Sequence, residues 1–244
     1  MVKVISFSLW GSKKVITCIS NDYFIGAIKN AKLALDFYPD FECWFYVHKE
    51  TVPQHIIDEL NSISNTKIIY KTGDLNKTKP MTWRFESIDH PDVEINLSRD
   101  TDTRFLLREK LAVEEWMKSD KIFHIMRDHP HHRFCILGGM FGVKKNNIIK
   151  SWKSLIDTKI TQKGQRDYDQ IFLKNIIYPK IINNCIIHTT FGILNNEKLS
   201  YAKPFPIPYC KNYYFVGGYV YHDDSVSTEH TNILKKCVRA GRRH

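Results

Sequence analysis

Short apolar runs alternate with stretches of helical periodicity along most of the chain. Apolar residues at helical spacing predict helices at 24–38, 53–63, 105–117, 147–157 and 166–177. The apolar runs between them predict strands at 2–9, 43–48, 67–71, 93–98, 121–126, 135–143 and 185–188. This alternation is typical of βαβ units, so we predict an α/β fold with a mostly parallel central sheet flanked by helices in a single domain.

The limits of several elements can also be predicted. Asn21 or Asp22 suits the N-cap of the first helix, and Pro39 would end it. Residues 72–92 are polar and predict an irregular connection. Gly138 and Gly139 predict a strand that bends or that another molecule approaches closely. The hydrophobic periodicity is weak near the C-terminal end of the sequence. We therefore place the domain at 1–220 and expect a basic C-terminal segment, which could be flexible, at 221–244.

The composition bounds the class of protein. The 244 residues are 43% hydrophobic and 25% charged, which excludes disordered and low-complexity classes. A net charge of +10 indicates a phosphate-rich partner: nucleic acid, anionic membrane or a phosphorylated small molecule. Six scattered cysteines fit neither a zinc site nor a disulfide framework and predict buried free thiols in a reducing compartment. No signal peptide or membrane span is visible, so a cytoplasmic location is expected.

The strongest candidate for chemistry is Asp100-x-Asp102, where a strand gives way to a helix. Two carboxylates at this spacing can reach one hard cation, and Mg²⁺ or Mn²⁺ held this way typically also binds a diphosphate. A lone D-x-D is frequent by chance, but open α/β sheets bind ligands at the carboxyl ends of their strands. Arg99, Arg104 and Arg108 lie close by in the sequence and could neutralise phosphates, or be solvated surface charges.

Two further acids stand out by helical spacing. Glu109 falls within the apolar face of its helix, where an unpaired carboxylate would be costly, so we expect it to pair with an arginine such as Arg84, Arg104 or Arg127. Asp169 begins the core-facing stripe of a later helix. It is either an acid favoured by the helix dipole or a carboxylate directed into a cleft, where it could act as general base.

Histidines offer weaker signals. His129, His131 and His132 share a short segment, but no fourth ligand has the spacing of a zinc site, which favours a polar loop. His188 follows Ile186 and Ile187 at a predicted strand end. It could complete a metal shell with the aspartate pair, although a lone histidine is more often simply hydrogen-bonded. Nucleophile motifs, a P-loop and G-x-G-x-x-G are absent.

Several ordered motifs together resemble one family, the metal-dependent GT-A glycosyltransferases of large DNA viruses and some bacteria, which use nucleotide-diphosphate sugars. The resemblance covers about nine-tenths of the chain. Its motifs are Tyr23, Asn30, Tyr38-Pro39, Trp83 to Phe85, Leu97 to Arg104, Arg108 to Lys110, Glu115-Trp116, His124 to Pro130, Gly138 to Gly142, Tyr168 to Leu173, Tyr178-Pro179 and His188.

The resemblance implies a GT-A (Rossmann-like) fold, a Mn²⁺ or Mg²⁺ cofactor, a nucleotide-sugar donor (UDP-sugar favoured) and a glycan or glycoprotein acceptor. By this resemblance, Asp100, Asp102 and His188 would bind the metal. Asp169 would be the catalytic residue, with Asp128 as the second choice of base. The residues implied to bind the donor are Ser8, Trp10, Gly11, Arg84, Arg99, Asp100, Gly138, Gly139 and Lys203. Gly138 and Gly139 would border the acceptor. Nucleic acid is not expected as a partner, and the oligomeric state is left open.

Two other functions fit parts of the sequence. Asp100-Thr101-Asp102-Thr103 also matches the nucleophile motif of haloacid-dehalogenase-like phosphatases, with Asp223 and Asp224 as later metal ligands. That motif normally follows the first strand, whereas about three α/β units precede it here. A basic nucleic-acid-binding module is the non-enzymatic alternative, since Lys235, Lys236, Arg239, Arg242 and Arg243 form a C-terminal cluster that accounts for half of the excess charge.

Overall fold

A computed structural model of the chain describes residues 1–11, 18–75, 77–160, 167–194 and 197–241. Its described strands form one sheet in the order β3-β2-β1-β4-β6-β5-β7-β8. Neighbouring strands are parallel except that β6 runs antiparallel to both β4 and β5. The strands are β1 (Val2–Leu9), β2 (Phe41–His48), β3 (Thr66–Lys71), β4 (Val93–Arg99), β5 (Phe123–Arg127), β6 (Met140–Lys144), β7 (Cys185–Thr189) and β8 (Ala202–Lys203).

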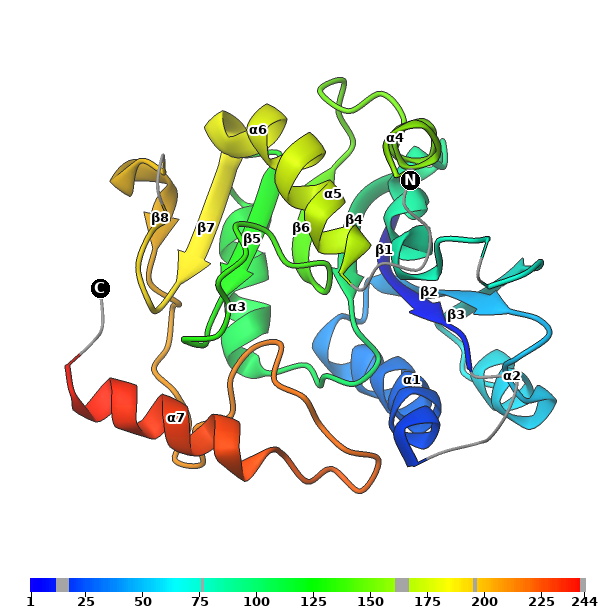
Figure 1. Cartoon of the computed structure of the whole chain (residues 1–244), viewed down its shortest axis with the longest axis horizontal. Helices are drawn as coiled ribbons and strands as arrows, with labels where there is room; N and C mark the ends of the chain where they lie inside the picture. Colours follow the sequence, from blue (N-terminus) through cyan, green and yellow to red (C-terminus); the bar gives the residue numbers. More distant parts are fainter. Residues whose placement is uncertain (12–17, 76, 161–166, 195–196, 242–244) are drawn as a thin grey trace.

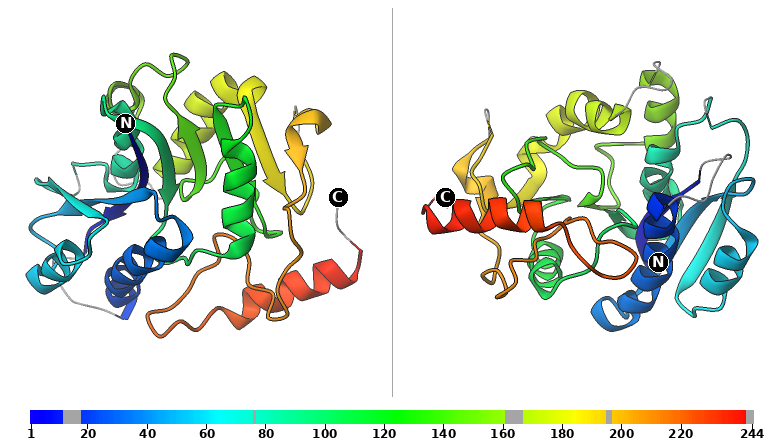
Figure 2. Two further views of the ribbon diagram at one scale, coloured as in Figure 1. Left: turned by 180° about the vertical axis from the view of Figure 1, so that it is seen from behind. Right: turned by 60° about the horizontal axis from the view of Figure 1, so that its bottom comes forward.

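Helices cover both faces of this sheet (Figures 1 and 2). One face carries α1 (Cys18–Phe37), α2 (Gln54–Asn61) and α3 (Leu107–Met117). The other carries the 3-10 helix η1 (Pro80–Asp89), α4 (Trp152–Lys159), α5 (Tyr168–Phe172), the π-helical turn η2 (Leu173–Ile177) and α6 (Tyr178–Ile181). Short 3-10 turns, η3 (Ile182–Asn184) and η4 (Leu199–Tyr201), flank β7 and β8, and α7 (Thr228–Arg239) follows the C-terminal segment.

The two faces of the sheet bury separate apolar clusters. In β1, Ile5 and Phe7 pack on the side of α1, whereas Val4 faces η1 and α4. Successive side chains of a strand point to opposite faces, so each central strand contributes to both clusters. The near-continuous apolar character of β1 and β2 follows from this burial on both sides. The predicted single α/β domain with a mostly parallel sheet flanked by helices is confirmed.

Some local predictions were wrong. Asn21 and Asp22 lie inside α1, because the helix already includes Cys18. Part of the connection at 72–92 is η1, which is largely buried despite its polar sequence. Gly138 and Gly139 precede β6 instead of lying within a strand. The helix predicted from 147 begins at Trp152, where the Ser151 side chain caps it by accepting the amide N–H of Ser154.

The C-terminal segment packs against the rest of the chain through its described residues. Leu234 of α7 is fully buried and shares an apolar cluster with Phe215 and Val238. In Figure 1 the segment before α7 crosses the lower side of the molecule to α1 and returns. This packing explains the order at 221–241, since apolar burial offsets the entropy of fixing the backbone. The domain boundary at residue 220 stays a prediction, and Arg242 and Arg243 lie outside the described residues.

The cysteines were predicted to be free and buried, and the structure agrees for some of them. Cys43, Cys135 and Cys185 are unpaired and buried, whereas Cys210 is unpaired but exposed. Burial raises the pKa of the Cys43 and Cys185 thiols to about 12, which keeps them protonated and unreactive. A search of the described helices finds none with the length and apolar character needed to cross a membrane.

Candidate active site

The candidate site lies where β1 and β4 end, beside the point at which β6 reverses the strand direction. β1 and β4 are parallel neighbours with Ser6 opposite Ser98. Ser8 and Asp100 each lie two residues further on and therefore reach the same edge of the sheet. The antiparallel β6 places Met140 opposite Arg99, so the residues just before β6 meet the end of β4. Such an edge is where open α/β sheets bind ligands.

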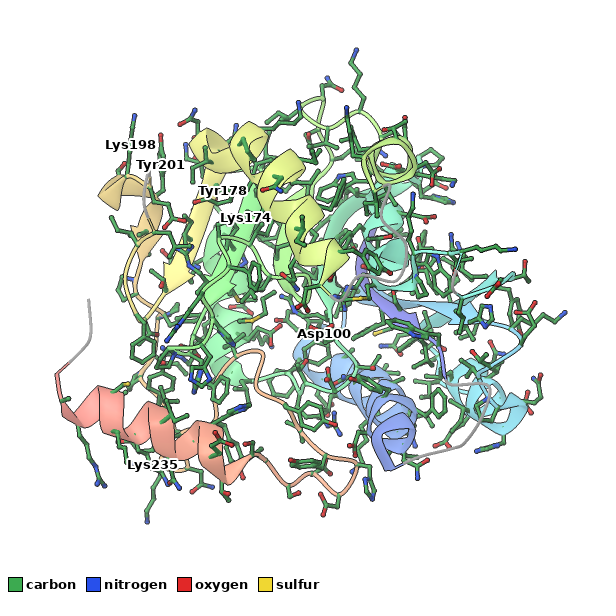
Figure 3. All side chains as sticks on the ribbon, viewed as in Figure 1. Asp100, Lys174, Tyr178, Lys198, Tyr201 and Lys235 are labelled. Atoms are coloured by element: carbon green, nitrogen blue, oxygen red, sulfur yellow. The ribbon has the colours of Figure 1, made fainter. Side chains whose placement is uncertain are left out.

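Three charged side chains from three different elements converge at this edge. The Arg84 guanidinium of η1 forms an ion pair with Asp100, and its Nη2 lies 3.5 Å from Oδ2 of Asp169 on α5. Asp169 and Arg84 are almost fully buried, whereas the Asp100 side chain is 40% exposed. Figure 3 shows Asp100 near the middle of the molecule, between α1 and the end of the sheet. Arg84 is therefore a buried cation shared by two acids.

The Asp169 carboxylate has an unusual environment for a buried acid. Neither of its oxygens has a hydrogen-bond partner among the described residues. Burial raises its pKa to about 6, an effect that the Arg84 charge opposes. A buried carboxylate with free lone pairs and a pKa near neutrality is suited to accept a proton or to contact a polar ligand.

Two β1 hydroxyls hold Arg84 in place through its backbone. The Ser6 hydroxyl donates to the Arg84 carbonyl over 2.6 Å, and the Ser8 hydroxyl accepts the Arg84 amide N–H over 3.0 Å. Both serines lie on the same face of β1 because they are two residues apart. Ser8 was predicted to bind the donor directly, but in the structure it positions Arg84 and is itself 7% exposed. The role of Ser6 could not be predicted from the sequence, because nothing distinguishes it there from the other residues of the strand.

Gly138 and Gly139 lie directly against these charged groups. A Cβ atom at Gly139 would lie 1.8 Å from Oδ2 of Asp100, and one at Gly138 would lie 2.7 Å from both Arg84 Nη2 and Asp169 Oδ2. The Ser98 hydroxyl fixes this segment by donating to the Gly138 carbonyl over 2.6 Å. The glycine pair is thus explained by the close approach of the backbone to side chains of this same chain, whereas the approach of another molecule stays a prediction.

Asp102 follows on the turn after β4. The Thr103 hydroxyl donates to the Asp100 carbonyl over 3.0 Å, and the amide N–H of Val220 donates to the Asp102 carbonyl over 2.8 Å. Burial and the nearby Asp100 charge raise the pKa of Asp102 to about 7. Two carboxylates that oppose each other's ionisation in this way provide hard oxygen donors whose repulsion a divalent cation would relieve.

The donor set of Asp100 and Asp102 therefore fits a hard cation, but it does not include a third protein ligand. No group of three His, Cys, Asp or Glu side chains suited to a metal occurs within the described ranges. An ion at this site would complete its shell with substrate oxygens or water, which is the usual arrangement for Mg²⁺ and Mn²⁺ bound with a diphosphate.

His188 is not brought to the aspartate pair, so its predicted place in the metal shell was wrong. One ring nitrogen lies 2.8 Å from His124 Nε2, and the other lies 3.2 Å from Glu115. Lys203 also contacts Glu115, with its Nζ 2.6 Å from the carboxylate. His188 and Lys203 are thus neighbours, as the family pattern suggests, but they meet at α3. Their position follows from β7 and β8, which lie at the far edge of the sheet from β1.

Asp128 is saturated by donors and has no lone pair left for a base. Its oxygens accept from the Arg108 guanidinium at 2.9 and 3.0 Å, the Thr190 hydroxyl at 2.8 Å, the Tyr209 hydroxyl at 2.8 Å and the Val216 amide at 3.0 Å. The side chain is fully buried. This acid joins the main domain to the C-terminal segment, and the structure does not support its predicted catalytic role.

The arginines near the D-x-D in sequence are also engaged elsewhere. Arg99 is buried and its Nε donates to Glu109 over 2.6 Å. Glu109 was correctly expected to pair with an arginine, but its partner is Arg99 and none of those proposed. Arg104 pairs with Asp224 at 3.2 Å. The predicted phosphate-binding role of Arg99 is therefore not supported, because its guanidinium lies on the α3 side of the sheet.

Aromatic rings border the same edge where β1 and β2 end. Trp10 makes an edge contact with Trp83, with ring centroids 6.4 Å apart, and His48 stacks on Trp83 at 6.0 Å. The Gly11 amide donates to the Thr51 hydroxyl over 3.1 Å. The predicted residue Trp10 thus adjoins Arg84 through its neighbour Trp83, whereas Gly11 contacts Thr51. His48 and Thr51 were missed, because nothing in the sequence links the end of β2 to this loop.

The chain was compared with known protein families, curated proteins and solved structures. No protein-family model and no curated protein matches the sequence. The fold overlaps that of 4-diphosphocytidyl-2C-methyl-D-erythritol synthase from Anaerococcus prevotii (TM-score 0.47, 11% identity, 82% of this chain and 91% of that one). It also overlaps a glycosyltransferase involved in glycosylation of the major capsid of PBCV-1 (0.43, 16%, 77% and 81%) and the galactosyltransferase LgtC (0.43, 12%, 77% and 73%).

Proposed function

We propose that this protein is a divalent-cation-dependent glycosyltransferase that moves a sugar from a nucleoside-diphosphate sugar, with a UDP-sugar favoured, to a hydroxyl of a glycan or protein-linked acceptor. The observation that carries the proposal is the convergence of Asp100, Arg84 and Asp169 against Gly138 and Gly139 at the end of β4. The family resemblance of the ordered motifs supports the same reaction. GT-A transferases are expected to place a D-x-D at this edge.

Each group has a defined part in the proposed donor site. Asp100 and Asp102 would hold Mn²⁺ or Mg²⁺, which would stabilise the negative charge of the departing diphosphate. Trp10 and Gly11 would contact the nucleotide, with Trp83 beside them. Arg84 would exchange its contact with Asp100 for a phosphate oxygen once the cation neutralises the acid, because a guanidinium forms strong paired bonds to phosphate.

The transfer itself forms one bond and breaks another. The acceptor oxygen bonds to the anomeric carbon, and the bond from that carbon to the phosphate oxygen breaks, with its electron pair leaving on the nucleoside diphosphate. If configuration inverts, Asp169 takes the acceptor proton, a role that its free oxygens and raised pKa support. If configuration is retained, Asp169 orients or stabilises the sugar instead.

Calorimetry tests the donor site directly. We expect at least one member of a panel of UDP-, GDP- and dTDP-sugars to bind in Mn²⁺ and not in a chelator. Asp102→Ala should weaken that binding by at least about tenfold, or 1.4 kcal/mol. Asp120→Ala, whose side chain is 84% exposed and which lies at the Lys144 end of β6, the end away from Gly139, is the matched control. Absence of metal-dependent binding across the panel would refute the proposal.

The role of Asp169 needs a separate experiment. Asp169→Asn keeps the size of the side chain but removes the proton acceptor. The variant should bind the donor like the wild type while losing transfer by about 10²-fold or more, as is typical for loss of a general base. Unchanged turnover would reject Asp169 as the base.

The two alternatives receive no support from the contacts. Asp224, a metal ligand in the phosphatase hypothesis, is held by Lys29 at 2.5 Å and by Arg104 at 3.2 Å. In the nucleic-acid hypothesis the basic cluster is a separate module, but α7 is fixed to the domain by a buried stripe that includes Leu234 and Val238. Phosphate release without donor binding would favour the first hypothesis.

A further inference from the structure

A buried asparagine of α1 reaches the D-x-D turn between its two acids. The Nδ2 amide of Asn30 donates to the carbonyl of Thr101, the middle residue of Asp100-x-Asp102, over 3.2 Å. Both residues are almost fully buried, with Asn30 1% exposed and Thr101 3% exposed. The bond joins positions that are 71 residues apart in the chain. α1 therefore contacts the candidate metal site through the backbone of the turn and not through a ligand side chain.

The hydrogen bonds to this turn fix the backbone of Asp102 on both sides. A peptide group is planar, so a donor that holds one carbonyl also fixes the orientation of the next amide N–H. Asn30 in this way fixes the peptide plane before Asp102. The amide N–H of Val220, which donates to the Asp102 carbonyl over 2.8 Å, fixes the plane after it. Each residue has only two freely rotating backbone bonds, so the direction of the Asp102 Cα–Cβ bond follows from these two contacts.

The three successive carbonyls of the motif each accept from a different part of the chain. The Asp100 carbonyl accepts from the Thr103 hydroxyl within the turn, over 3.0 Å. The Thr101 carbonyl accepts from α1, and the Asp102 carbonyl accepts from the C-terminal segment. Two acids that bind one cation need a defined relative orientation, and fixing them only on binding would cost entropy. The hydrogen bonds to these carbonyls supply that orientation in advance.

Close packing of α1 on the turn depends on a glycine. Asp22, Gly26 and Asn30 are four residues apart and lie on one side of the helix. A Cβ atom at Gly26 would overlap the carbonyl oxygen of Thr101 and lie 3.0 Å from its carbonyl carbon. Only a residue without a side chain lets the helix come close enough for Asn30 to reach the same carbonyl.

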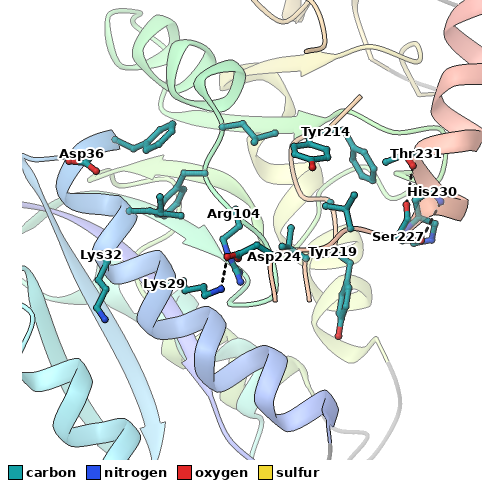
Figure 4. A pocket seen from close by; sticks show the side chains of 18 residues that line it. Lys29, Lys32, Asp36, Arg104, Tyr214, Tyr219, Asp224, Ser227, His230 and Thr231 are labelled. Atoms are coloured by element: carbon teal, nitrogen blue, oxygen red, sulfur yellow. Dashed lines mark hydrogen bonds and ion pairs between the residues drawn. The ribbon is translucent and has the colours of Figure 1, made fainter. Parts of the chain in front are cut away.

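The same helix also holds the segment that carries Val220. The Asp22 carboxylate accepts from the hydroxyl of Tyr219, which directly precedes Val220, over 2.7 Å. Figure 4 shows Asp224 beside Lys29 of α1, where the two side chains pair at 2.5 Å. α1 thus holds one side of the turn directly and the other side through the C-terminal segment.

The second polar atom of Asn30 indicates that the residue does more than stabilise the fold. Its Oδ1 is buried and has no hydrogen-bond partner among the described residues. A buried amide that is only half satisfied lowers stability, so a leucine of similar size would suit α1 better. Arg104 is a further donor to the Thr101 carbonyl, but its Nη1 is 3.4 Å away and also donates to the Thr103 carbonyl over 2.9 Å. Asn30 therefore makes the shorter bond to Thr101, and it does so at a cost in stability.

We propose that Asn30 is a positioning residue of the metal site, which orients Asp102 by fixing the Thr101 carbonyl and does not itself contact the cation or the donor. The inference rests on the proposed glycosyltransferase function, because the cation is the one of the donor site. Without the Asn30 amide, the Asp102 carboxylate is free to turn away from Asp100. One cation then no longer meets both acids at once, and its affinity falls.

The test measures binding of Mn²⁺ to the full chain by electron paramagnetic resonance, since the signal of the free ion is lost on binding. UDP, GDP or dTDP is present as the nucleoside diphosphate. Asn30→Leu keeps the size of the side chain and removes the donor. We expect the apparent Kd for Mn²⁺ to rise at least about tenfold, as for a lost hydrogen bond to a buried group. The Tm should not fall, because the half-satisfied amide is gone and Arg104 still reaches the Thr101 carbonyl.

A second variant displaces the same turn by a different route. Gly26→Ala adds a Cβ that overlaps the Thr101 carbonyl, while alanine favours a helix more than glycine does. It should raise the Kd for Mn²⁺ by a similar factor. Asn65→Leu is the matched control: the Asn65 amide donates to the Ala31 carbonyl of α1 over 3.3 Å, and its Oδ1 is also buried without a partner among the described residues. Asn65 precedes β3, which β2 and β1 separate from β4, so the Kd should not change.

Two results would overturn the inference. One is wild-type affinity for Mn²⁺ in both Asn30→Leu and Gly26→Ala. The other is an equal loss of affinity in Asn65→Leu, which would assign the effect to α1 as a whole. If Asn30→Leu does not fold, Gly26→Ala decides by itself. These results leave the proposed function intact when the wild type binds Mn²⁺ with a nucleoside diphosphate, whereas absence of that binding refutes the metal site and this inference with it.

Discussion

The guanidinium of Arg84 lies against the carboxylate of Asp169, with Nη2 3.5 Å from Oδ2, in a place where both side chains are nearly excluded from water. The same guanidinium pairs with Asp100, so one cation balances two acids. Burial alone would lower the pKa of Arg84, but the two carboxylates raise it, and the arginine stays charged. The site therefore has two carboxylates but only one positive charge to balance them. This excess of negative charge favours binding of a cation or protonation of one carboxylate.

The first prediction concerns stability and Asp169. Its pKa is raised to about 6 in the folded chain, against 3.8 when unfolded, so the folded state binds more protons between these values. The free energy of unfolding should fall as pH rises from about 4 to 6. At about 1.4 kcal/mol per pKa unit, the loss is roughly 3 kcal/mol. Asp169→Asn should therefore stabilise the fold at pH 8 in a chelator, by chemical denaturation, and have little effect at pH 4.

A matched substitution checks that this gain comes from the buried charge. Asp120→Asn, at a side chain that is 84% exposed, should leave the unfolding free energy unchanged at both pH values. If Asp169→Asn destabilises the fold at pH 8, the carboxylate makes a net favourable contribution and the assignment of a strained, underpaired acid is wrong.

The second prediction concerns the glycine pair. Gly139→Ala introduces a Cβ at a position 1.8 Å from the Asp100 carboxylate oxygen, so that side chain must leave its present place. Metal-dependent nucleotide-sugar binding should weaken by at least about tenfold. Gly241→Ala, whose Cβ meets nothing within 4 Å, is the control for binding, although its positive φ of 67° adds local strain. Equal donor affinity in Gly139→Ala and the wild type would show that Asp100 does not bind the donor complex.

The third prediction separates structure from catalysis at Asp128. Asp128→Ala leaves the buried Arg108 guanidinium without its acid and frees Thr190, Tyr209 and the Val216 amide. Breaking a buried pair of this kind costs about 3–5 kcal/mol, so Tm should fall by roughly 10 °C. Thermal unfolding followed by circular dichroism measures it. A variant with wild-type Tm but no transfer activity would instead return Asp128 to the list of candidate bases.

The fourth prediction concerns acid sensitivity near α7. His129 and His132 each accept a backbone amide at Nδ1, from His131 at 3.1 Å and from Asp128 at 3.0 Å, so both rings must be neutral. Burial lowers their pKa values to about 4 and about 3. An unfolded histidine titrates near 6.5, so below that pH the unfolded state takes up more protons and stability falls as pH drops.

His132→Asn tests this cause, because its side-chain oxygen can accept the Asp128 amide but does not titrate in this range. Urea unfolding at pH 7 and pH 5 should show a smaller acid-induced loss of stability than in the wild type. His55→Asn, at an exposed position of α2, should keep the full loss. Identical pH slopes in His132→Asn and the wild type would assign the acid sensitivity to other groups. The loop predicted for this segment is confirmed, since residues 128–139 form neither helix nor strand, and within it His129 stacks on Phe215 and also contacts the His132 ring.

Much of the fold could be predicted because it depends on local patterns. Strands β1 and β7 follow from apolar runs bounded by polar residues, and α3 follows from helical spacing. Asp100, Asp169 and Gly139 were singled out as candidates because they stand at element ends, and the structure brings them together. Ser6 and the C-terminal contacts to α1 could not be found, because their partners are distant in sequence and leave no local periodicity.

The sequence by itself determined the α/β class and the order of most strands and helices, and it singled out the acids that we propose for a donor site. Only the tertiary structure decided which charges meet. Arg99 and Asp100 are adjacent, yet Arg99 pairs with Glu109 on the α3 side while Asp100 meets Arg84 from η1 on the other. The reason is the two-residue repeat of a β-strand, which sends neighbours to opposite faces, so proximity in sequence near a strand end does not give proximity in space.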